Sequence, residues 1–309
     1  MRAVPILKIC TGLKDVERLP CDDLDGDVLN SGANAIDPIT KRFARAPASL
    51  RPYVDRIWSW ESRGAVPLPL MLPGTGAELV FHYRSPFAVV GENGAQLVLD
   101  RGLVMCLRSR ACQLVATGPV GFMAVRLRGE ALRHFAEVPL AEWIDGFAPI
   151  SAGLGGGWSE VPALLAEAPG FGARAAILEA RLEQHLAHRE VRSSVVDRAV
   201  TKFYYNAGSA QVADVADDLG MSARHFERLF CAATGLTPKR FQRVARFHHV
   251  MRRLLLAGRS DYLETALAYG FYDQAHFIHE CRDLTGRVPG ELLTRPQFLS
   301  HFYNPRLAG

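Results

Sequence analysis

The chain has 309 residues, of which 49% are hydrophobic and 22% charged, a balance typical of a soluble globular protein with an apolar core. Its length predicts two domains, and its formal net charge of +4 is too small to indicate nucleic acid by itself. No apolar run approaches the roughly 18 residues of a membrane helix, and the first residues lack a signal-peptide core. We therefore expect a cytoplasmic protein with no membrane partner.

The first half of the chain predicts an irregular arm followed by a β-rich domain. Residues 1–45 show little periodicity and include the acidic stretch CDDLDGDVLNSGANAIDP. Over 46–190, short apolar runs such as YVDRIWSW and AELVFHYR alternate with turn sequences such as LPGTG and GENG. Many short strands bounded by turns predict a β-barrel or sandwich. Helical patterns follow, and the amphipathic stretch ARAAILEARLEQHLAHR is either a dimer seam or a helix that packs on the β-structure.

The segment over 193–297 is helical in pattern and contains an internal repeat. VADDLGMSARHFERLFCAATGLTP and ALAYGFYDQAHFIHECRDLTGRVP both place Ala, three residues, Gly, then Phe and Thr-Gly-x-x-Pro. A small residue at a helix contact and a glycine at the turn predict a helix-turn-helix in each copy. Ser222 and Asp273 are the expected N-caps of the second helices, which end at Gly235 and Gly286. Between the copies, TPKRFQRVARFHHVMRRLLLAG predicts one long, rigid helix.

These motifs resemble the DNA-binding domain of the AraC/XylS family of bacterial transcription regulators. VADVADDLGMSARHFERLF, ATGLTPKRFQ and ALAYGFYDQAHFIHECRDLTGRVPGEL carry the resemblance, and Cys281 departs from it because the family usually has a bulky Phe there. The segment before 190 is similar, through YVDRIWSW and LMLPGTGAELVFHYR, to the β-rich N-terminal domain of some AraC-type regulators. The resemblance implies an α+β multidomain protein: a regulatory domain over 46–190, a DNA-binding domain over 193–297 and a tail over 298–309.

The second helix of each repeat, called the recognition helix below, is expected to enter the major groove of double-stranded DNA. Helical spacing places Phe226 and Phe277 on the buried face of each recognition helix and leaves the opposite face of the helix exposed. On that exposed face an Arg side chain can form two hydrogen bonds to guanine, and a Gln side chain can form two to adenine. Spacing and resemblance give a base-proximal set: Arg224, Glu227, Arg228, Gln274, Ala275, His276 and His279. A second set is predicted either to bind phosphate or to be a solvated basic face: Lys239, Arg240, Arg246 and Arg282. Because His276 and His279 lack a third ligand, we expect no metal and no cofactor.

The β-rich domain is expected to carry the regulatory input. Candidate effector-pocket residues, each of which is also an ordinary core or strand residue, are Trp58, Trp60, Phe81, Tyr83, Phe122 and Arg126. We expect a sequence-specific transcription regulator that is not an enzyme, with a small-molecule effector, RNA polymerase and a second copy of the chain as candidate partners. One alternative is a DNA-docked thiol enzyme that uses Cys106 or Cys112, with Arg108 and Arg110 between them. A nonspecific architectural DNA binder is another, and it predicts no preferred site.

Overall fold

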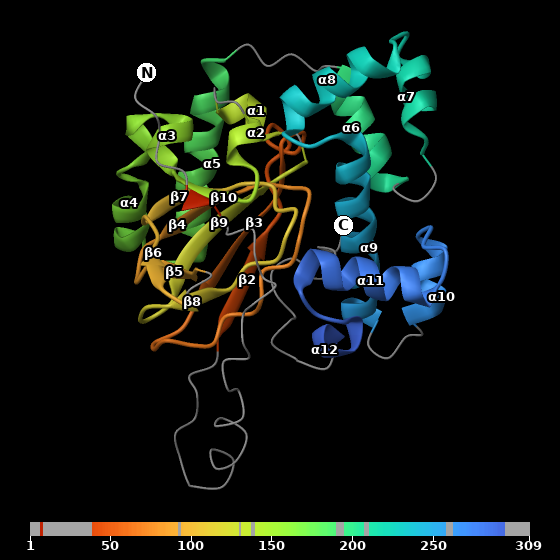
Figure 1. Cartoon of the computed structure of the whole chain (residues 1–309). Coiled ribbons are helices and arrows are strands. Elements are labelled where there is room, and N and C mark those ends of the chain that lie inside the picture. The colour runs from red at the N-terminus through yellow and green to blue at the C-terminus, as the bar shows by residue number, and fades with distance from the viewer. Residues whose placement is uncertain are drawn as a thin grey trace, which may run out of the picture.

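The computed structural model describes residues 7–8, 39–91, 94–129, 131–136, 140–189, 195–206, 210–257 and 262–293. A β-rich domain, whose last covering helix ends at Ala187, lies beside a helical domain whose first described helix begins at Val195 (Figure 1). The α+β architecture predicted from the sequence is confirmed. Most of the predicted arm, the predicted domain boundary near 190–193 and the tail over 298–309 lie outside the described residues.

Two antiparallel sheets form the β-rich domain. The larger sheet has the order β1-β10-β7-β4-β9-β3-β2. Its strands are β1 (Leu7–Lys8), β2 (Thr40–Ala44), β3 (Val54–Glu61), β4 (Glu78–His82), β7 (Gly102–Met105), β9 (Gly121–Leu127) and β10 (Gly146–Pro149). The smaller sheet contains β6 (Gln96–Val98), β5 (Phe87–Val90) and β8 (Leu114–Ala116), in that order. Among the described strands the two sheets form an open sandwich, not a closed barrel.

Strand β2 corrects the prediction that the first 45 residues are irregular throughout. Its residues pair with β3, and Phe43 lies opposite Trp58. The stretch TKRFA is short and largely exposed, so it lacks the apolar alternation by which a strand is recognised. Its place in the sheet is set by backbone hydrogen bonds to a neighbouring strand, which a local sequence pattern does not display.

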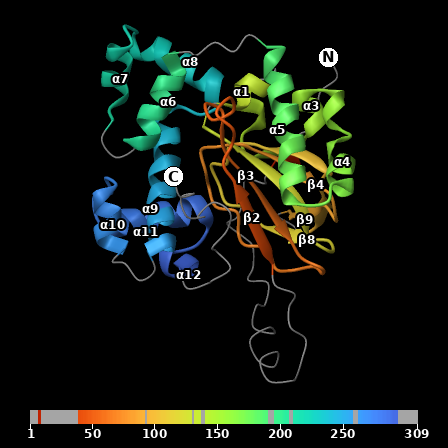
Figure 2. The same cartoon turned by 180° about the vertical axis from the view of Figure 1, so that it is seen from behind.

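The larger sheet buries both of its faces, because successive side chains on a strand point in opposite directions. On β9, Phe122 and Ala124 face the core between the sheets, whereas Met123 and Val125 face the helices behind. The covering helices are α1 (Leu132–Phe135), α2 (Leu140–Trp143), α3 (Ile150–Leu154), the short 3-10 helix η3 (Gly156–Trp158), α4 (Val161–Glu167) and α5 (Phe171–Ala187). Figure 2 shows α3, α4 and α5 side by side along one side of the sheet. Helix α5 buries Leu178 and Leu182 in this rear core, so this amphipathic stretch packs on the β-structure.

The helical domain contains the two predicted helix-turn-helix units. Helix α6 (Val195–Tyr205) precedes the first unit, which consists of α7 (Val212–Asp218) and α8 (Ala223–Thr234). The second unit consists of α10 (Tyr262–Ala268) and α11 (Gln274–Thr285), followed by α12 (Pro289–Leu293). Helix α9 (Pro238–Ala257) joins the units, and its 20 residues span about 30 Å at 1.5 Å per residue. Figure 1 shows α8 and α11 near opposite ends of α9. No described helix is long and apolar enough to cross a membrane.

The predicted caps and turns of the two units are present. Ser222 and Asp273 accept hydrogen bonds from the backbone N–H groups of His225 and His276, at 3.4 and 2.7 Å. The turn glycines Gly220 and Gly270 have φ of 67° and 82°, a conformation that a side chain would strain. Both recognition helices end at glycines in the left-handed conformation, Gly235 and Gly286.

The β-rich domain contacts the C-terminal end of each recognition helix. At the end of α8, a Cβ added to Gly235 would lie 2.6 Å from Cγ1 of Ile144, so only glycine permits this approach. Near the end of α11, the backbone N–H of Ala111 donates a 3.0 Å hydrogen bond to the carbonyl oxygen of Leu284. The β-rich domain therefore contacts the recognition helix of each unit.

Candidate nucleic-acid interface

Helix α8 places the predicted residues of the first unit on its outer face. Arg224, Glu227 and Arg228 are exposed, whereas Phe226 and Phe230 are fully buried. The guanidinium of Arg228 donates to Nδ1 of His225 at 3.0 Å, which links two exposed polar side chains one turn apart. This surface offers arginine donors and a glutamate acceptor, the groups that bind guanine and cytosine edges in the major groove.

Helix α11 presents the corresponding surface of the second unit. Gln274, Ala275 and His279 are exposed, and His276 is half-buried. Nδ1 of His276 accepts a 3.3 Å hydrogen bond from the backbone N–H of Tyr272. The rings of His276 and Phe271 pack edge to face, with their centroids 5.2 Å apart. The imidazole of His276 is thereby held against the turn, while Gln274, Ala275 and His279 stay on the outer face.

An ion-pair cluster fixes α11 on the long helix. Nε of Arg243, on α9, donates to Oε1 of Glu280 at 2.6 Å, and the same guanidinium pairs with Asp283. Glu280 is 5% exposed, and the hydrogen bond of Asp283 to Arg243 lowers the pKa of that carboxyl. The orientation of the second recognition helix therefore depends on a charged contact between α9 and α11.

The four residues predicted to bind phosphate differ in their surroundings. Lys239 and Arg282 are exposed. Arg240 donates to Oγ of Ser109 at 2.6 Å and lies 3.8 Å from a carboxylate oxygen of Asp145, both in the β-rich domain. The guanidinium of Arg246 lies 4.7 Å from the ring centre of Phe271. Phosphate contacts by Arg240 and Arg246 would compete with these internal contacts, so Lys239 and Arg282 are the better placed pair.

Both recognition helices expose the outer face of their first two turns and contact the β-rich domain at their C-terminal ends. The predicted base-proximal residues lie at 224–228 and 274–279, whereas the contacts with Ile144 and Ala111 involve Gly235 and Leu284. The β-rich domain therefore holds each helix at the end that carries no predicted base contact.

Tyr272 is a candidate contact that the sequence analysis did not select. It is 87% exposed and lies in the turn immediately before α11. Helical periodicity identifies the outer face of a helix but gives no orientation for a turn residue, so no local pattern points to Tyr272. An exposed aromatic ring beside a recognition helix can contact the sugar-phosphate backbone through its hydroxyl.

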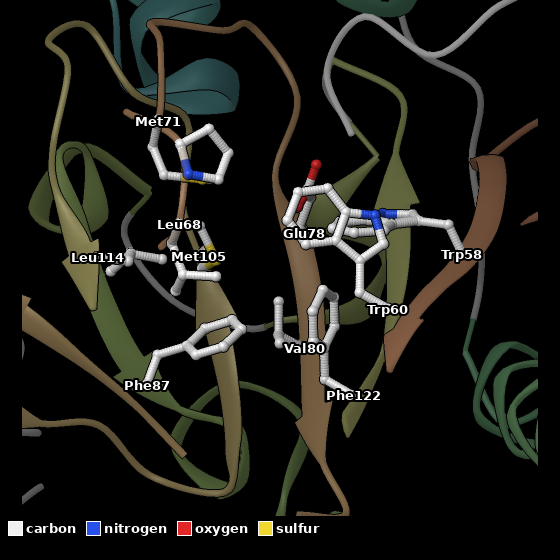
Figure 3. A pocket seen from close by; sticks show the side chains of 11 residues that line it. Trp58, Trp60, Leu68, Met71, Glu78, Val80, Phe87, Met105, Leu114 and Phe122 are labelled. Carbon is white, nitrogen blue, oxygen red and sulfur yellow. The ribbon is translucent and has the colours of Figure 1, made fainter. Parts of the chain in front are cut away.

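The predicted effector-pocket residues are divided between different places. Trp58, Trp60 and Phe122 lie together between the sheets, with the rings of Trp58 and Phe122 4.9 Å apart. They line an apolar cavity of about 20 Å³ beside Glu78 (Figure 3). A cavity of that size holds about one water molecule.

The other three members lie elsewhere. Phe81 belongs to the rear core, where its ring stacks on Trp158 at 5.9 Å. Tyr83 also belongs to that core, and its hydroxyl donates to Glu61. Arg126 is buried and pairs with Glu78 at 2.8 Å.

The cysteines of the thiol-enzyme alternative are both buried, with Cys106 2% and Cys112 5% exposed. Burial raises the pKa of Cys112 to about 12, although Arg108 lies nearby and acts in the opposite direction. A reactive cysteine is an accessible thiolate, so neither residue supports that alternative. Within the described ranges, no three His, Cys, Asp or Glu side chains are grouped closely enough to hold a metal ion.

Comparisons with known proteins agree with this division into two domains. Residues 215–295 match the family model of a helix-turn-helix domain, and residues 42–149 match a domain of unknown function (DUF6597). No curated protein matches the chain.

Three solved structures of ToxT from Vibrio cholerae show a low similarity. One covers 84% of this chain and 98% of its own, with 8% identity and a TM-score of 0.45. The alignment with ToxT of strain SCE256 bound to an unsaturated fatty acid covers 85% of this chain and 96% of the ToxT chain, with 7% identity and a TM-score of 0.44. The alignment with ToxT of strain O395 bound to (E)-4-(8-methylnaphthalen-1-yl)but-3-enoic acid covers 84% of this chain and 99% of the ToxT chain, with 9% identity and a TM-score of 0.43. Similarity at this level supports no inference about what this chain binds.

Proposed function

We propose that this chain, an AraC-type protein with a helix-turn-helix domain at its C-terminus, regulates transcription by binding a specific DNA sequence with both recognition helices. The observation that supports the proposal is that α8 and α11 expose the outer face of their first two turns near opposite ends of one continuous helix. The exposed side chains there are of the types that bind base edges.

The length of α9 supports binding to two successive major-groove segments. Successive major-groove faces on one side of a duplex lie about 34 Å apart, and α9 spans about 30 Å at 1.5 Å per residue. A duplex that bends slightly toward the protein brings both segments within reach. Binding at a promoter then affects RNA polymerase, either by excluding it or by contacting it.

Substitution of one base-proximal residue in each unit tests the proposal. A binding site is first selected from random duplexes with the unmodified protein. Arg228→Ala and Gln274→Ala should each weaken binding to that site by about 1–3 kcal/mol and leave binding to unrelated DNA almost unchanged. Arg63→Ala removes an exposed arginine of the β-rich domain and serves as the matched control.

Two outcomes would overturn the proposal. If no sequence is enriched in the selection, the protein is a nonspecific DNA binder. If both variants weaken binding to every duplex equally, Arg228 and Gln274 contact the backbone and not the bases. By contrast, Lys239→Ala and Arg282→Ala should weaken binding to all sequences and reduce the salt dependence by about one released ion each.

A further inference from the structure

A cavity of about 930 Å³ lies between the β-rich domain and the helical domain. Its walls come from β3, β9 and residues 75–76 on one side, and from α6, α9 and the turn after α10 on the other. It is separate from the apolar cavity between the sheets. Small-molecule sites typically have volumes of about 300–1,000 Å³, so this cavity is large enough for a metabolite.

The lining of this cavity is strongly basic. It contains one acidic side chain, Asp55, and five arginines: Arg56, Arg126, Arg128, Arg252 and Arg253. Asp55 pairs with Arg56 at 2.9 Å, and the nearby Glu78 pairs with Arg126 at 2.8 Å. Even with Glu78 included, the positive charges outnumber the negative ones.

Both domains contribute positive charges to the lining of the cavity. His248, on α9, lines the cavity and is 2% exposed. Burial is the main cause that lowers the pKa of His248 well below its usual value, and Arg126 of β9 and Arg252 of α9 act in the same direction. Arg126 from the β-rich domain and Arg252 from the helical domain both line this region together with His248. A ligand with negative charge is complementary to that region.

An aromatic wall lies on the helical side. The ring of His249 stacks on Tyr269 with a centroid separation of 5.6 Å and an interplanar angle of 5°, and it contacts Tyr204 at 4.5 Å. Nε2 of His249 is 2.7 Å from the carbonyl oxygen of Tyr204, which fixes the ring. Tyr205 extends this wall and is 66% exposed. Flat aromatic surfaces favour a ligand with a planar body.

We propose that this cavity binds a small molecule that carries a phosphate or carboxylate group on an aromatic or heterocyclic body. Arg126 and Arg128 from the β-rich domain and Arg252 from α9 bind the anionic group, and the tyrosine and histidine rings contact the planar body. An occupant that contacts both domains stabilises their docked arrangement. Through that arrangement it affects how α8 and α11 are presented to DNA, a consequence that rests on the proposed function.

Ligand binding to the full-length protein tests the site without DNA. The probes are adenosine monophosphate, phenyl phosphate and benzoate, with adenosine and benzamide as uncharged counterparts, followed by calorimetry and thermal unfolding. At least one anion should bind saturably and raise the melting temperature, and its uncharged counterpart should not. Arg128→Gln and Arg252→Gln should each weaken that binding by about tenfold or more, because each removes a charge-assisted hydrogen bond. Arg63→Gln is the control and should bind like the unmodified protein.

The choice of variants keeps the outcome decisive. Arg128 is exposed, so its replacement leaves the buried Glu78–Arg126 pair intact. If none of the anions binds, or if both glutamine variants bind as well as the control, the proposal is wrong. If Arg128→Gln weakens DNA binding without added anion and the anions compete with DNA, the cavity holds the DNA backbone, which also overturns it. If the protein binds an anion saturably but selects no DNA sequence, the proposed ligand site is supported and the function proposed above is refuted.

Discussion

The two helix-turn-helix units have capping residues, turn glycines and helix ends at equivalent positions, but different forces hold their recognition helices. In the first unit, Phe230 of α8 packs between Phe203 and Phe241, with ring separations of 5.5 Å to each. At the equivalent place of the second unit stands Cys281, and Arg243 pairs with Glu280 and Asp283 beside it. Apolar packing fixes α8, whereas a smaller apolar contact and an ion-pair cluster fix α11.

This difference teaches that one motif can be stabilised in two ways within a single chain. Aromatic packing depends little on salt, whereas a partly exposed ion pair weakens as ionic strength rises. We therefore expect the second unit to respond more strongly to salt and to single substitutions of charge, and the first to cavity-forming substitutions.

The largest expected effect comes from truncating the equivalent core residues of the two units. Phe230→Ala should lower the free energy of unfolding by about 3–5 kcal/mol, because it leaves a cavity in a fully buried aromatic cluster. Cys281→Ala removes a single sulfur atom and should cost only about 1 kcal/mol. Chemical denaturation of both variants measures the difference. Equal costs would mean that the two units are packed alike.

Removing the ion-pair cluster should come next. Arg243→Met leaves the carboxylate of Glu280, which is 5% exposed, without this partner and should cost about 2–3 kcal/mol. Lys239→Met, an exposed position on the same helix, should change stability by less than about 0.5 kcal/mol. The cost of Arg243→Met should shrink at high salt. A cost that does not change with salt would show that packing of the arginine side chain, and not its charge, holds α11.

Acid should destabilise the protein in part through a buried histidine of the β-rich domain. His82 is fully buried, and burial lowers its pKa to about 4. Below pH 6.5 His82 binds a proton in the unfolded chain but not in the folded chain. The free energy of unfolding therefore decreases as the pH falls from 6.5 toward 4. His82 should account for about 2 kcal/mol of the loss between pH 7 and pH 5. His82→Gln should remove that part of the pH dependence, as measured by denaturation at both pH values; an unchanged slope would assign the proton uptake to another group.

The smallest expected effects are those of the N-caps, which also distinguish the units. Asp273 accepts its capping hydrogen bond at 2.7 Å and Ser222 at 3.4 Å. Asp273→Ala should cost about 1–2 kcal/mol and Ser222→Ala about 0.5–1 kcal/mol, because a shorter bond to a charged acceptor is stronger. Thermal unfolding can rank the two variants. A larger cost for Ser222→Ala would contradict the geometry of the caps.

The local features of the helical domain could be predicted from sequence, because caps, turn glycines and buried stripes recur at fixed spacings. The predicted outward residues of α8 and α11 are exposed in the structure for the same reason, with His276 half-buried. Contacts between distant segments could not be predicted in this way. The partners of Arg240 and Arg243 come from elements far along the chain, and so does the convergence of Arg126 with Arg252 at the cavity between the domains.

The uninterrupted course of α9 has a consequence for the DNA that such a regulator would accept. Its sequence contains proline only at the first position and no glycine, so the helix has no hinge. One extra base pair between the two contacted segments would rotate them by about 34° around the duplex axis, since a helical turn takes about 10.5 base pairs. A straight helix cannot follow that rotation. The target sites of this protein should therefore vary in their base sequence but hardly at all in the spacing between their two halves.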